Sequence, residues 1–255
     1  MPRLSVTYRS ECLIRDTRVE IYLPEGMKNT REGMRTLILL HGYTGSAENW
    51  VGEELANKYN FAIICPNGEN GFWLNGLCTG HRYQDLLGEE LITFLRATFG
   101  LAMKKEDTFI MGLSMGGFGA LHTALAYPDT FGTAACLSSA LIWYNIAHMA
   151  PDFKDGIANY EYYRECFGDL NALDTSLNNP EVQIRELLKK GTPLPRLYLC
   201  CGSEDFLIEP NRKFIAFLKE NKIEHSYFEG TGIHDMNYWQ NAVHKLVPVM
   251  FGKEE

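Results

Sequence analysis

Two kinds of hydrophobic pattern follow each other along this chain. Near the start, apolar and polar residues alternate over 4–8 and again over 17–23, which predicts an antiparallel pair of strands with one face exposed to solvent. The turn Pro24-Glu25-Gly26 ends this pair. After residue 29 the pattern changes to short apolar runs bounded by turn residues, which are typical of parallel strands buried on both faces. Strands of this second part are expected at 36–40, 61–65, 108–111, 133–137, 197–201 and 225–228.

Helical periodicity fills most of the intervals between these strands. Apolar residues recur at helical spacing over 83–99, and Gly100 supplies a C-cap. The other helices are expected at 115–127, 181–190, 210–221 and 236–250. Alternating strands and helices predict an α/β fold with a mostly parallel central sheet, an antiparallel N-terminal pair and helices on both faces. The length of 255 residues fits one large domain over residues 1–255.

The stretch 140–192 interrupts this alternation. It is rich in Tyr, Asn and Asp, and it contains only short helical pieces. We interpret it as a small insertion or partial cap over the carboxyl ends of the strands, where open α/β sheets bind ligands. The alternative interpretation is a surface excursion with no role in ligand binding.

Composition and charge limit the classes of partner. The hydrophobic share of 45% and the charged share of 22% are ordinary for a globular protein. A formal net charge of −8 argues against nucleic acid or an anionic membrane as a partner, because both require a basic surface. Residues 1–5 contain no apolar core of signal-peptide length, and no later run approaches the length of a membrane span. We therefore expect neither a leader nor a membrane anchor.

The seven cysteines point to a reducing compartment. Cys65, Cys136, Cys200 and Cys201 all lie in strand-like apolar runs, where free cysteine behaves as a small buried hydrophobe. Cys200 and Cys201 are too close in sequence for a structural bridge, and the chain has no C-x-x-C pair for zinc. We expect a cytoplasmic protein, and the sequence leaves open whether its surface binds an ion.

The most informative motif is the pentapeptide Gly112-Leu113-Ser114-Met115-Gly116 at the end of the run 108–111. A serine hydroxyl becomes an effective nucleophile when a tight strand-to-helix turn exposes it beside a base and amide donors. A side chain at either flanking glycine would collide with the neighbouring strand or helix. Because G-x-S-x-G is short, the prediction that Ser114 is a nucleophile depends on the rest of the site.

The acid and the base are expected downstream of the serine, each after a strand. Asp205 follows the strand 197–201 in a turn and is our candidate for the acid, with Glu204 as the second choice. The alternative role for Asp205 is to cap the next helix from a solvated turn. Among seven histidines, His234 has the required position, because it follows the strand 225–228 through a flexible loop.

The oxyanion hole is expected to combine two backbone N–H groups. Met115 supplies one of them by its position after the serine. Tyr43 supplies the other, because Gly42 lets the chain bend after the strand 36–40. We expect His41 to organise this loop by hydrogen bonding and Asp235 to cap the last helix.

With these residues in place, the chain resembles the α/β-hydrolase esterases of the esterase D and S-formylglutathione hydrolase type, and in particular their compact bacterial tributyrin-esterase members. The resemblance covers nearly the whole chain. It is carried by Leu40-His41-Gly42 with Gly45, by residues 112–117, by residues 201–206, and by Gly232-Ile233-His234-Asp235 with Trp239. It implies serine carboxylesterase chemistry on short acyl esters, with Ser114, Asp205 and His234 as the catalytic triad. It also implies a small-molecule ester substrate and no metal or organic cofactor.

The acyl group is not fixed by this resemblance. Members of the group act on formyl thioesters, on acetyl and butyryl esters, and on feruloyl esters of plant polysaccharide. Tyr43 is aromatic where such loops often carry a smaller aliphatic residue. Trp73 and Trp143 are candidates for lining an acyl or aromatic pocket, with ordinary core packing as the alternative. The region 71–78 and the stretch 140–192 are expected to set the acyl preference.

Four other functions stay open from the sequence. A thioesterase of the S-formylglutathione hydrolase type would use the same triad. A non-catalytic binding protein of this fold usually lacks a triad member, whereas all three are present here. A depsipeptide or siderophore-ester hydrolase would accept bulkier substrates, and a protease would need stronger protonation of the leaving group. A homo-oligomer is compatible with the sequence, which does not specify the number of subunits.

Overall fold

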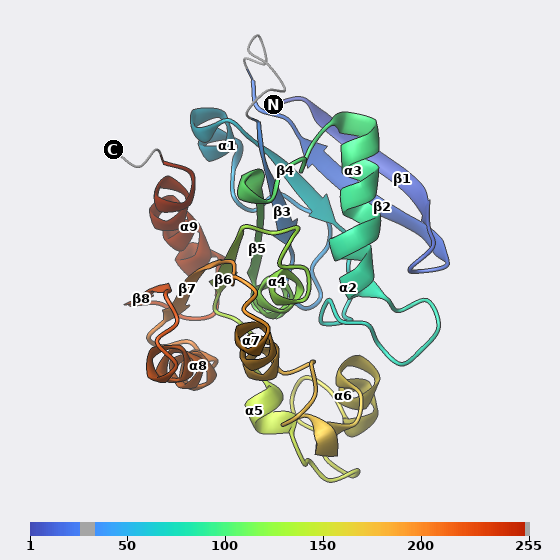
Figure 1. Ribbon diagram of the computed structural model, residues 1–255, viewed down its shortest axis with the longest axis vertical. Helices are drawn as coiled ribbons and strands as arrows, with labels where there is room; N and C mark the ends of the chain where they lie inside the picture. The colour runs from blue at the N-terminus through green and yellow to red at the C-terminus, as the bar shows by residue number, and fades with distance from the viewer. Residues whose placement is uncertain (26–33, 253–255) are drawn as a thin grey trace.

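The computed structural model describes residues 1–25 and 34–252, and its central feature is an eight-stranded sheet (Figure 1). Its order is β1-β2-β4-β3-β5-β6-β7-β8. The antiparallel neighbours are β1 with β2 and β2 with β4, and every other pair is parallel. The strands are β1 (Arg3–Ser10), β2 (Arg15–Tyr22), β3 (Arg35–Leu40), β4 (Phe61–Pro66), β5 (Thr108–Leu113), β6 (Thr133–Leu137), β7 (Arg196–Gly202) and β8 (Ser226–Gly230). Gly26 of the predicted turn lies outside the described residues.

Helices cover both faces of this sheet, because alternate residues of the central strands point to opposite sides. Leu37 and Leu39 of β3 pack into the core on one face, and Ile38 and Leu40 pack into the core on the other. The first face is covered by α1 (Glu53–Tyr59) and α9 (Met236–Phe251). The second is covered by α3 (Leu91–Phe99), α4 (Met115–Ala126) and α8 (Ile208–Glu220). The predicted fold class is confirmed.

Two helical details differ from the sequence prediction. The helix expected at 83–99 is divided into α2 (Tyr83–Asp85), a π-helical turn η2 (Leu86–Glu90) and α3. Gly88 in the π turn lies directly against the ring of Tyr127, and a Cβ there would be 2.1 Å from Tyr127 Cδ2. The short helix α1 was not expected, because its seven residues present only two buried apolar positions, too few for a periodic pattern.

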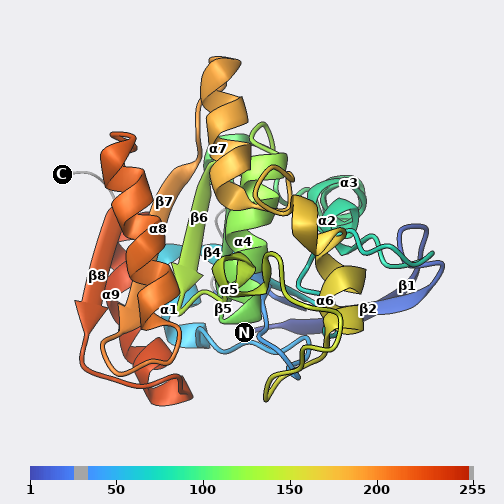
Figure 2. The ribbon, with the colours of Figure 1, turned by 90° about the horizontal axis from the view of Figure 1, so that it is seen from below.

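The segment 140–192 contributes no strand to the sheet. It forms α5 (Trp143–Ile146), α6 (Tyr160–Phe167), a 3₁₀ turn η4 (Leu170–Ala172) and α7 (Pro180–Lys189). The last of these is the helix expected at 181–190. In Figure 1, α5 and α6 lie below the sheet, and Figure 2, the view from that side, brings them to the front. Within the described part of the chain, no helix is both long and apolar enough to cross a membrane.

Candidate active site

Ser114 lies on a strained turn between β5 and α4. Its backbone angles are φ +55° and ψ −120°, outside the regions that a serine normally adopts. A Cβ at Gly112 would be 2.0 Å from the carbonyl oxygen of Gly116, and a Cβ at Gly116 would be 2.5 Å from that of His41. The two glycines are therefore required by close approach of the backbone, as the sequence predicted, and the turn presents the Ser114 side chain at the carboxyl end of β5.

Substituting Gly116 by alanine is expected to destabilise the fold by about 1–3 kcal/mol. The added Cβ would meet two backbone carbonyls, those of Leu40 and His41, which cannot rotate away. This clash outweighs the gain in helix propensity of about 1 kcal/mol. Urea unfolding followed by circular dichroism measures the difference. Gly156→Ala is the matched control, because nothing lies within 4 Å of its Cβ position. Equal unfolding midpoints for the two variants would contradict the close approach.

The structure brings together the three side chains predicted as the triad. His234, in the loop after β8, places Nε2 2.9 Å from the Ser114 Oγ. Its Nδ1 lies 2.9 Å from Oδ2 and 3.0 Å from Oδ1 of Asp205, which follows β7. A proton on Nδ1 is therefore donated to the carboxylate, and Nε2 is left to accept the hydroxyl proton of the serine. The arrangement can generate a serine nucleophile.

Asp205, and not its neighbour Glu204, faces the histidine. The Asp205 side chain is buried, whereas Glu204 is exposed to solvent. Burial raises the pKa of the Asp205 carboxyl, but hydrogen bonds from His234 and from the Leu207 amide lower it more, so that the pKa lies below its ordinary value. The loops that carry acid and base are also joined, because the Glu204 amide donates to the carbonyl of Gly232 at 3.0 Å. The lowered pKa leaves Asp205 ionised beside the imidazole at neutral pH.

Two aromatic rings hold the imidazole of His234. Phe206 lies against one side with ring centroids 4.5 Å apart, and Trp239 meets the ring edge-on at 4.8 Å. Trp239 comes from α9, whose first turn is capped by the Asp235 side chain accepting from the Tyr238 amide at 2.9 Å. The predicted capping role of Asp235 is confirmed. These contacts restrict rotation of the imidazole away from the serine.

The predicted oxyanion donors border the same space as the serine. Tyr43 and Met115 both line a pocket with Ser114, and neither backbone N–H donates a hydrogen bond to any described residue. The chain approaches the serine closely here, because a Cβ at Gly42 would be 3.3 Å from the Ser114 Cβ. Both amides are thus available for a developing negative charge.

His41 organises the loop before Tyr43, as predicted. The Gly68 amide donates to its Nε2 at 3.0 Å, so the proton is on Nδ1, which donates to the carbonyl of Gly42 at 2.8 Å. Burial lowers the pKa of His41, which keeps the ring neutral at physiological pH. Gly45 passes close to this ring, with its Cβ position 3.1 Å from Nδ1. His41 therefore has a structural and not a proton-transfer role.

Two pockets meet at Ser114. The first, which we call the oxyanion-side pocket, has a volume of about 260 Å³ and includes Tyr43 and Met115. The second, the histidine-side pocket, has about 420 Å³ and includes His234 and Trp239. Four residues border both pockets, namely Tyr43, Ser114, Ile157 and Phe206. An ester bound across the serine would place one substituent in each pocket. No group of described residues with metal-ligating geometry borders Ser114.

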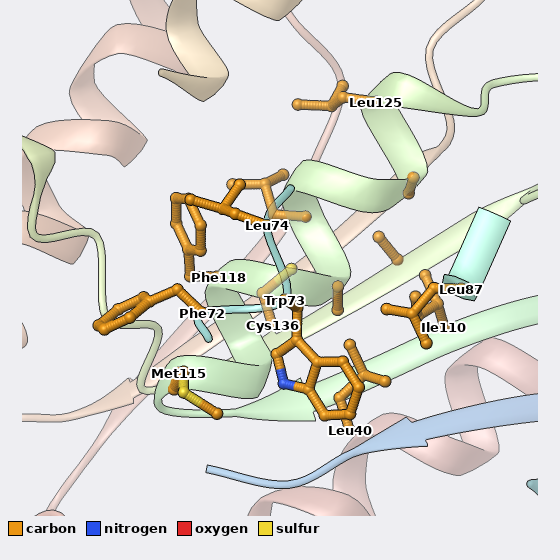
Figure 3. Close-up of a cluster of buried hydrophobic side chains, with 14 of the residues drawn as sticks. Leu40, Phe72, Trp73, Leu74, Leu87, Ile110, Met115, Phe118, Leu125 and Cys136 are labelled. Carbon is orange, nitrogen blue, oxygen red and sulfur yellow. The ribbon is translucent and has the colours of Figure 1, made fainter. Parts of the chain in front are cut away.

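Neither predicted pocket tryptophan lines these pockets, and this part of the prediction is corrected. Trp73 is fully buried, and its Nε1 donates to the carbonyl of His41 at 3.2 Å. Figure 3 shows its indole within the core beside Leu40 and Met115. Trp143 is also buried and packs against the rings of Phe118 and Phe214. Trp73 is a core residue because glycines leave space for its ring. Trp143 is a core residue because it packs against other aromatic rings.

The residues that do line the oxyanion-side pocket from the segment 140–192 were not singled out by the sequence. They include Ile142 and Ile146 near α5, Ile157 in the following loop and Tyr163 on α6. Asp155 fixes this loop, because it accepts from the amides of Ile157 and Ala158 and from the Tyr163 hydroxyl. The only sequence signal was the aromatic composition of the segment, which locates a region but not individual side chains.

Known proteins resemble this chain over nearly its full length. The Esterase family model matches residues 10–249. An acetyl esterase from Caldicellulosiruptor saccharolyticus is 36% identical and covers 95% of this chain and 96% of its own. Among solved structures, an S-formylglutathione hydrolase from Staphylococcus aureus is 26% identical with a TM-score of 0.83, covering 98% and 99% of the two chains. Fluorophosphonate-binding serine hydrolase F from the same organism is 25% identical with a TM-score of 0.85, covering 99% of each chain.

These matches extend across the strands and loops that carry Ser114, Asp205 and His234. The chain therefore belongs to the esterase family and is a carboxylic ester hydrolase with the α/β-hydrolase fold.

Proposed function

We propose that this protein hydrolyses esters of short acyl groups through an acyl-enzyme intermediate on Ser114. The observation that carries the proposal is the single imidazole of His234, which lies 2.9 Å from both the Ser114 Oγ and a carboxylate oxygen of Asp205. This is the geometry in which a histidine acts as general base toward serine while a buried carboxylate orients it.

The reaction proceeds in two acyl-transfer steps. Ser114 Oγ attacks the ester carbonyl carbon while His234 Nε2 accepts the hydroxyl proton, and Asp205 stabilises the resulting imidazolium. The amides of Tyr43 and Met115 donate to the oxyanion, each contributing about 3 kcal/mol to lowering the barrier. His234 then gives the proton to the departing alcohol. Water, deprotonated by the same histidine, attacks the acyl-enzyme and releases the acid.

We infer the positions of the two halves of the substrate from the two pockets. The carbonyl oxygen must reach Tyr43 and Met115, which both border the oxyanion-side pocket, and the acyl group therefore occupies that pocket. The leaving oxygen must reach His234 Nε2, which borders the histidine-side pocket, and the alcohol occupies that one. Ile142 and Ile146 wall the smaller pocket, which favours acetyl to butyryl groups over long chains. The acetyl esterase relative supports a small acyl group.

A panel of substrates tests the acyl assignment. We expect kcat/KM for p-nitrophenyl acetate and butyrate, and for tributyrin, to exceed that for p-nitrophenyl octanoate by at least about tenfold, since an acyl chain that clashes with the pocket wall costs about 1–3 kcal/mol. S-formylglutathione and methyl ferulate belong in the same panel. A large preference for the thioester selects the thioesterase alternative, which the S-formylglutathione hydrolase neighbour favours. A large preference for ferulate selects an aryl-ester role.

Enlarging the oxyanion-side pocket is expected to move the chain-length preference upward. Ile142→Ala removes side-chain volume from the pocket wall at a position that is only partly buried. The ratio of kcat/KM for p-nitrophenyl hexanoate to that for the acetate should rise about 5–10-fold, the effect of one to two methylene contacts. Leu188→Ala on the exposed surface of α7 is the control, with an unchanged ratio. An unchanged ratio in Ile142→Ala would place the acyl group elsewhere.

The cysteines support a reducing compartment, and we infer the cytoplasm. All seven are free, and six of them are buried. Burial raises the pKa of the thiols of Cys12, Cys166 and Cys201 to about 12, so they are inert at physiological pH. The exception is Cys78, which is exposed.

A further inference from the structure

Cys78 belongs to a compact group of side chains outside the triad, formed with His81 and Glu165 and called here the Cys-His-Glu cluster. Cys78 Sγ lies 3.0 Å from Oε2 of Glu165, and His81 Nδ1 lies 3.0 Å from Oε1 of the same carboxylate. The sulfur, the ring nitrogen and a carboxylate oxygen all lie within 4.8 Å of one another. Three different types of metal-ligating atom therefore lie close together.

The backbone holds these three side chains in place from two separate elements. The loop 75–82 is closed by a bridge between Asn75 and Arg82, and the Gly76 amide donates to the carbonyl of His81 at 2.8 Å. Glu165 projects from α6, and its Oε1 accepts from the Cys78 amide at 2.9 Å. A Cβ at Gly76 would be 2.8 Å from that oxygen, so the loop and the carboxylate are already in close contact. The fold therefore holds the three side chains of the Cys-His-Glu cluster in position.

We propose that the Cys-His-Glu cluster is a binding site for a divalent zinc ion. Thiolate, imidazole and carboxylate are the ligand types that proteins offer to zinc, and a thiolate disfavours the hard cations magnesium and calcium. Cys78 and His81 are exposed, which leaves a fourth coordination position open to water.

Proton balance gives this site a measurable signature. Without metal, the Cys78 thiol keeps its proton and donates a hydrogen bond to Glu165. Zinc binds the thiolate, so one thiol proton leaves for each ion bound. Without metal, His81 Nδ1 donates to Oε1 of Glu165. Zinc binding through Nδ1 moves this proton to Nε2, and a neutral imidazole therefore releases none. The net reaction exchanges one thiol proton for one zinc ion.

The ion would link two walls of the acyl pocket. Phe72 precedes the loop 75–82 in the chain, and Tyr163 lies on α6 two residues before Glu165. Both line the oxyanion-side pocket. Zinc between loop and helix would therefore stiffen this pocket without contacting the reacting atoms.

Direct metal titration tests the proposal independently of ester hydrolysis. The full chain, freed of metal with a chelator that is then removed, is titrated with zinc chloride in competition with a chromogenic chelator, and with cobalt(II) as a spectroscopic probe. We expect one saturable zinc site per chain, one proton released, and a thiolate-to-cobalt charge-transfer band. Cys78→Ser, His81→Ala and Glu165→Gln should each weaken zinc binding by roughly 100-fold.

A matched control distinguishes this site from adventitious surface binding. His148 and Asp174 form another exposed histidine–carboxylate pair, 2.7 Å apart, with no thiol beside it. His148→Ala should leave zinc binding unchanged. Absence of saturable binding at micromolar zinc, an unchanged affinity in Cys78→Ser, or a cobalt spectrum without the thiolate band would each overturn the proposal. Circular dichroism confirms that the exposed substitutions leave the protein folded.

Discussion

Replacing Ser114 by alanine is expected to lower kcat for p-nitrophenyl acetate by at least about 10³-fold. The substitution removes the one hydroxyl among the described residues that forms a hydrogen bond with His234 Nε2, at 2.9 Å. The small methyl side chain leaves the turn intact, so the variant should fold and should bind substrate. Residual hydrolysis would come from the oxyanion donors and from binding alone.

The measurement should separate lost chemistry from lost folding. Initial rates are compared with those of Ser226→Ala, an exposed serine at the start of β8 that should retain full activity. A pre-steady-state burst of p-nitrophenol in the unmodified protein, absent in Ser114→Ala, would report the acyl-enzyme directly. Near-full hydrolysis by Ser114→Ala would exclude this serine as the nucleophile.

The geometry at the serine could be anticipated from the sequence because it depends on local backbone constraints. Gly112 and Gly116 mark a turn that only glycine permits, and the order of Ser114, Asp205 and His234 follows from which strands end at the same edge of a parallel sheet. The choice of Asp205 over Glu204 also followed from the position of each carboxylate relative to the strand.

The pocket could not be anticipated, because its walls depend on contacts between distant segments. Trp73 lies in a loop rich in glycine, and the sequence left open whether it lines the pocket or packs in the core. It is buried because Gly68 and Gly119, which are 51 positions apart, both lack a side chain where its ring packs; a Cβ at Gly119 would be 2.5 Å from its Cδ1. Ile157 reaches the serine only because Asp155 folds its loop. Neither relation is visible as a pattern along the chain.

Replacing Asp205 by asparagine is expected to lower kcat by about 10⁴-fold while leaving the fold intact. The amide has nearly the same shape as the carboxylate, but its nitrogen donates where His234 Nδ1 needs an acceptor. The imidazole would then place its proton on Nε2 and lose the ability to accept the proton of Ser114. The oppositely charged partner that stabilises the imidazolium is lost as well.

Glu204→Gln provides the matched control for this experiment. It neutralises the adjacent carboxylate, which is exposed and makes no side-chain contact with His234. We expect its kcat to stay close to that of the unmodified protein. Comparable losses in the two variants would mean that charge in the turn, and not the specific Asp205–His234 hydrogen bond, supports catalysis.

The effect of Asp205→Asn on stability is also expected to depend on pH. The pKa of Asp205 is lower in the folded protein than its ordinary value, so ionisation of this carboxyl stabilises the fold. The contribution is fully present above the unfolded pKa of about 3.9 and is lost as the pH falls through the lower folded pKa. The difference in unfolding free energy between the unmodified protein and Asp205→Asn should therefore narrow as the pH is lowered from 6 toward that range. A difference that stays constant, measured by urea unfolding at each pH, would show that the carboxylate gains nothing from His234 in the fold, and would remove the electrostatic basis for its catalytic role.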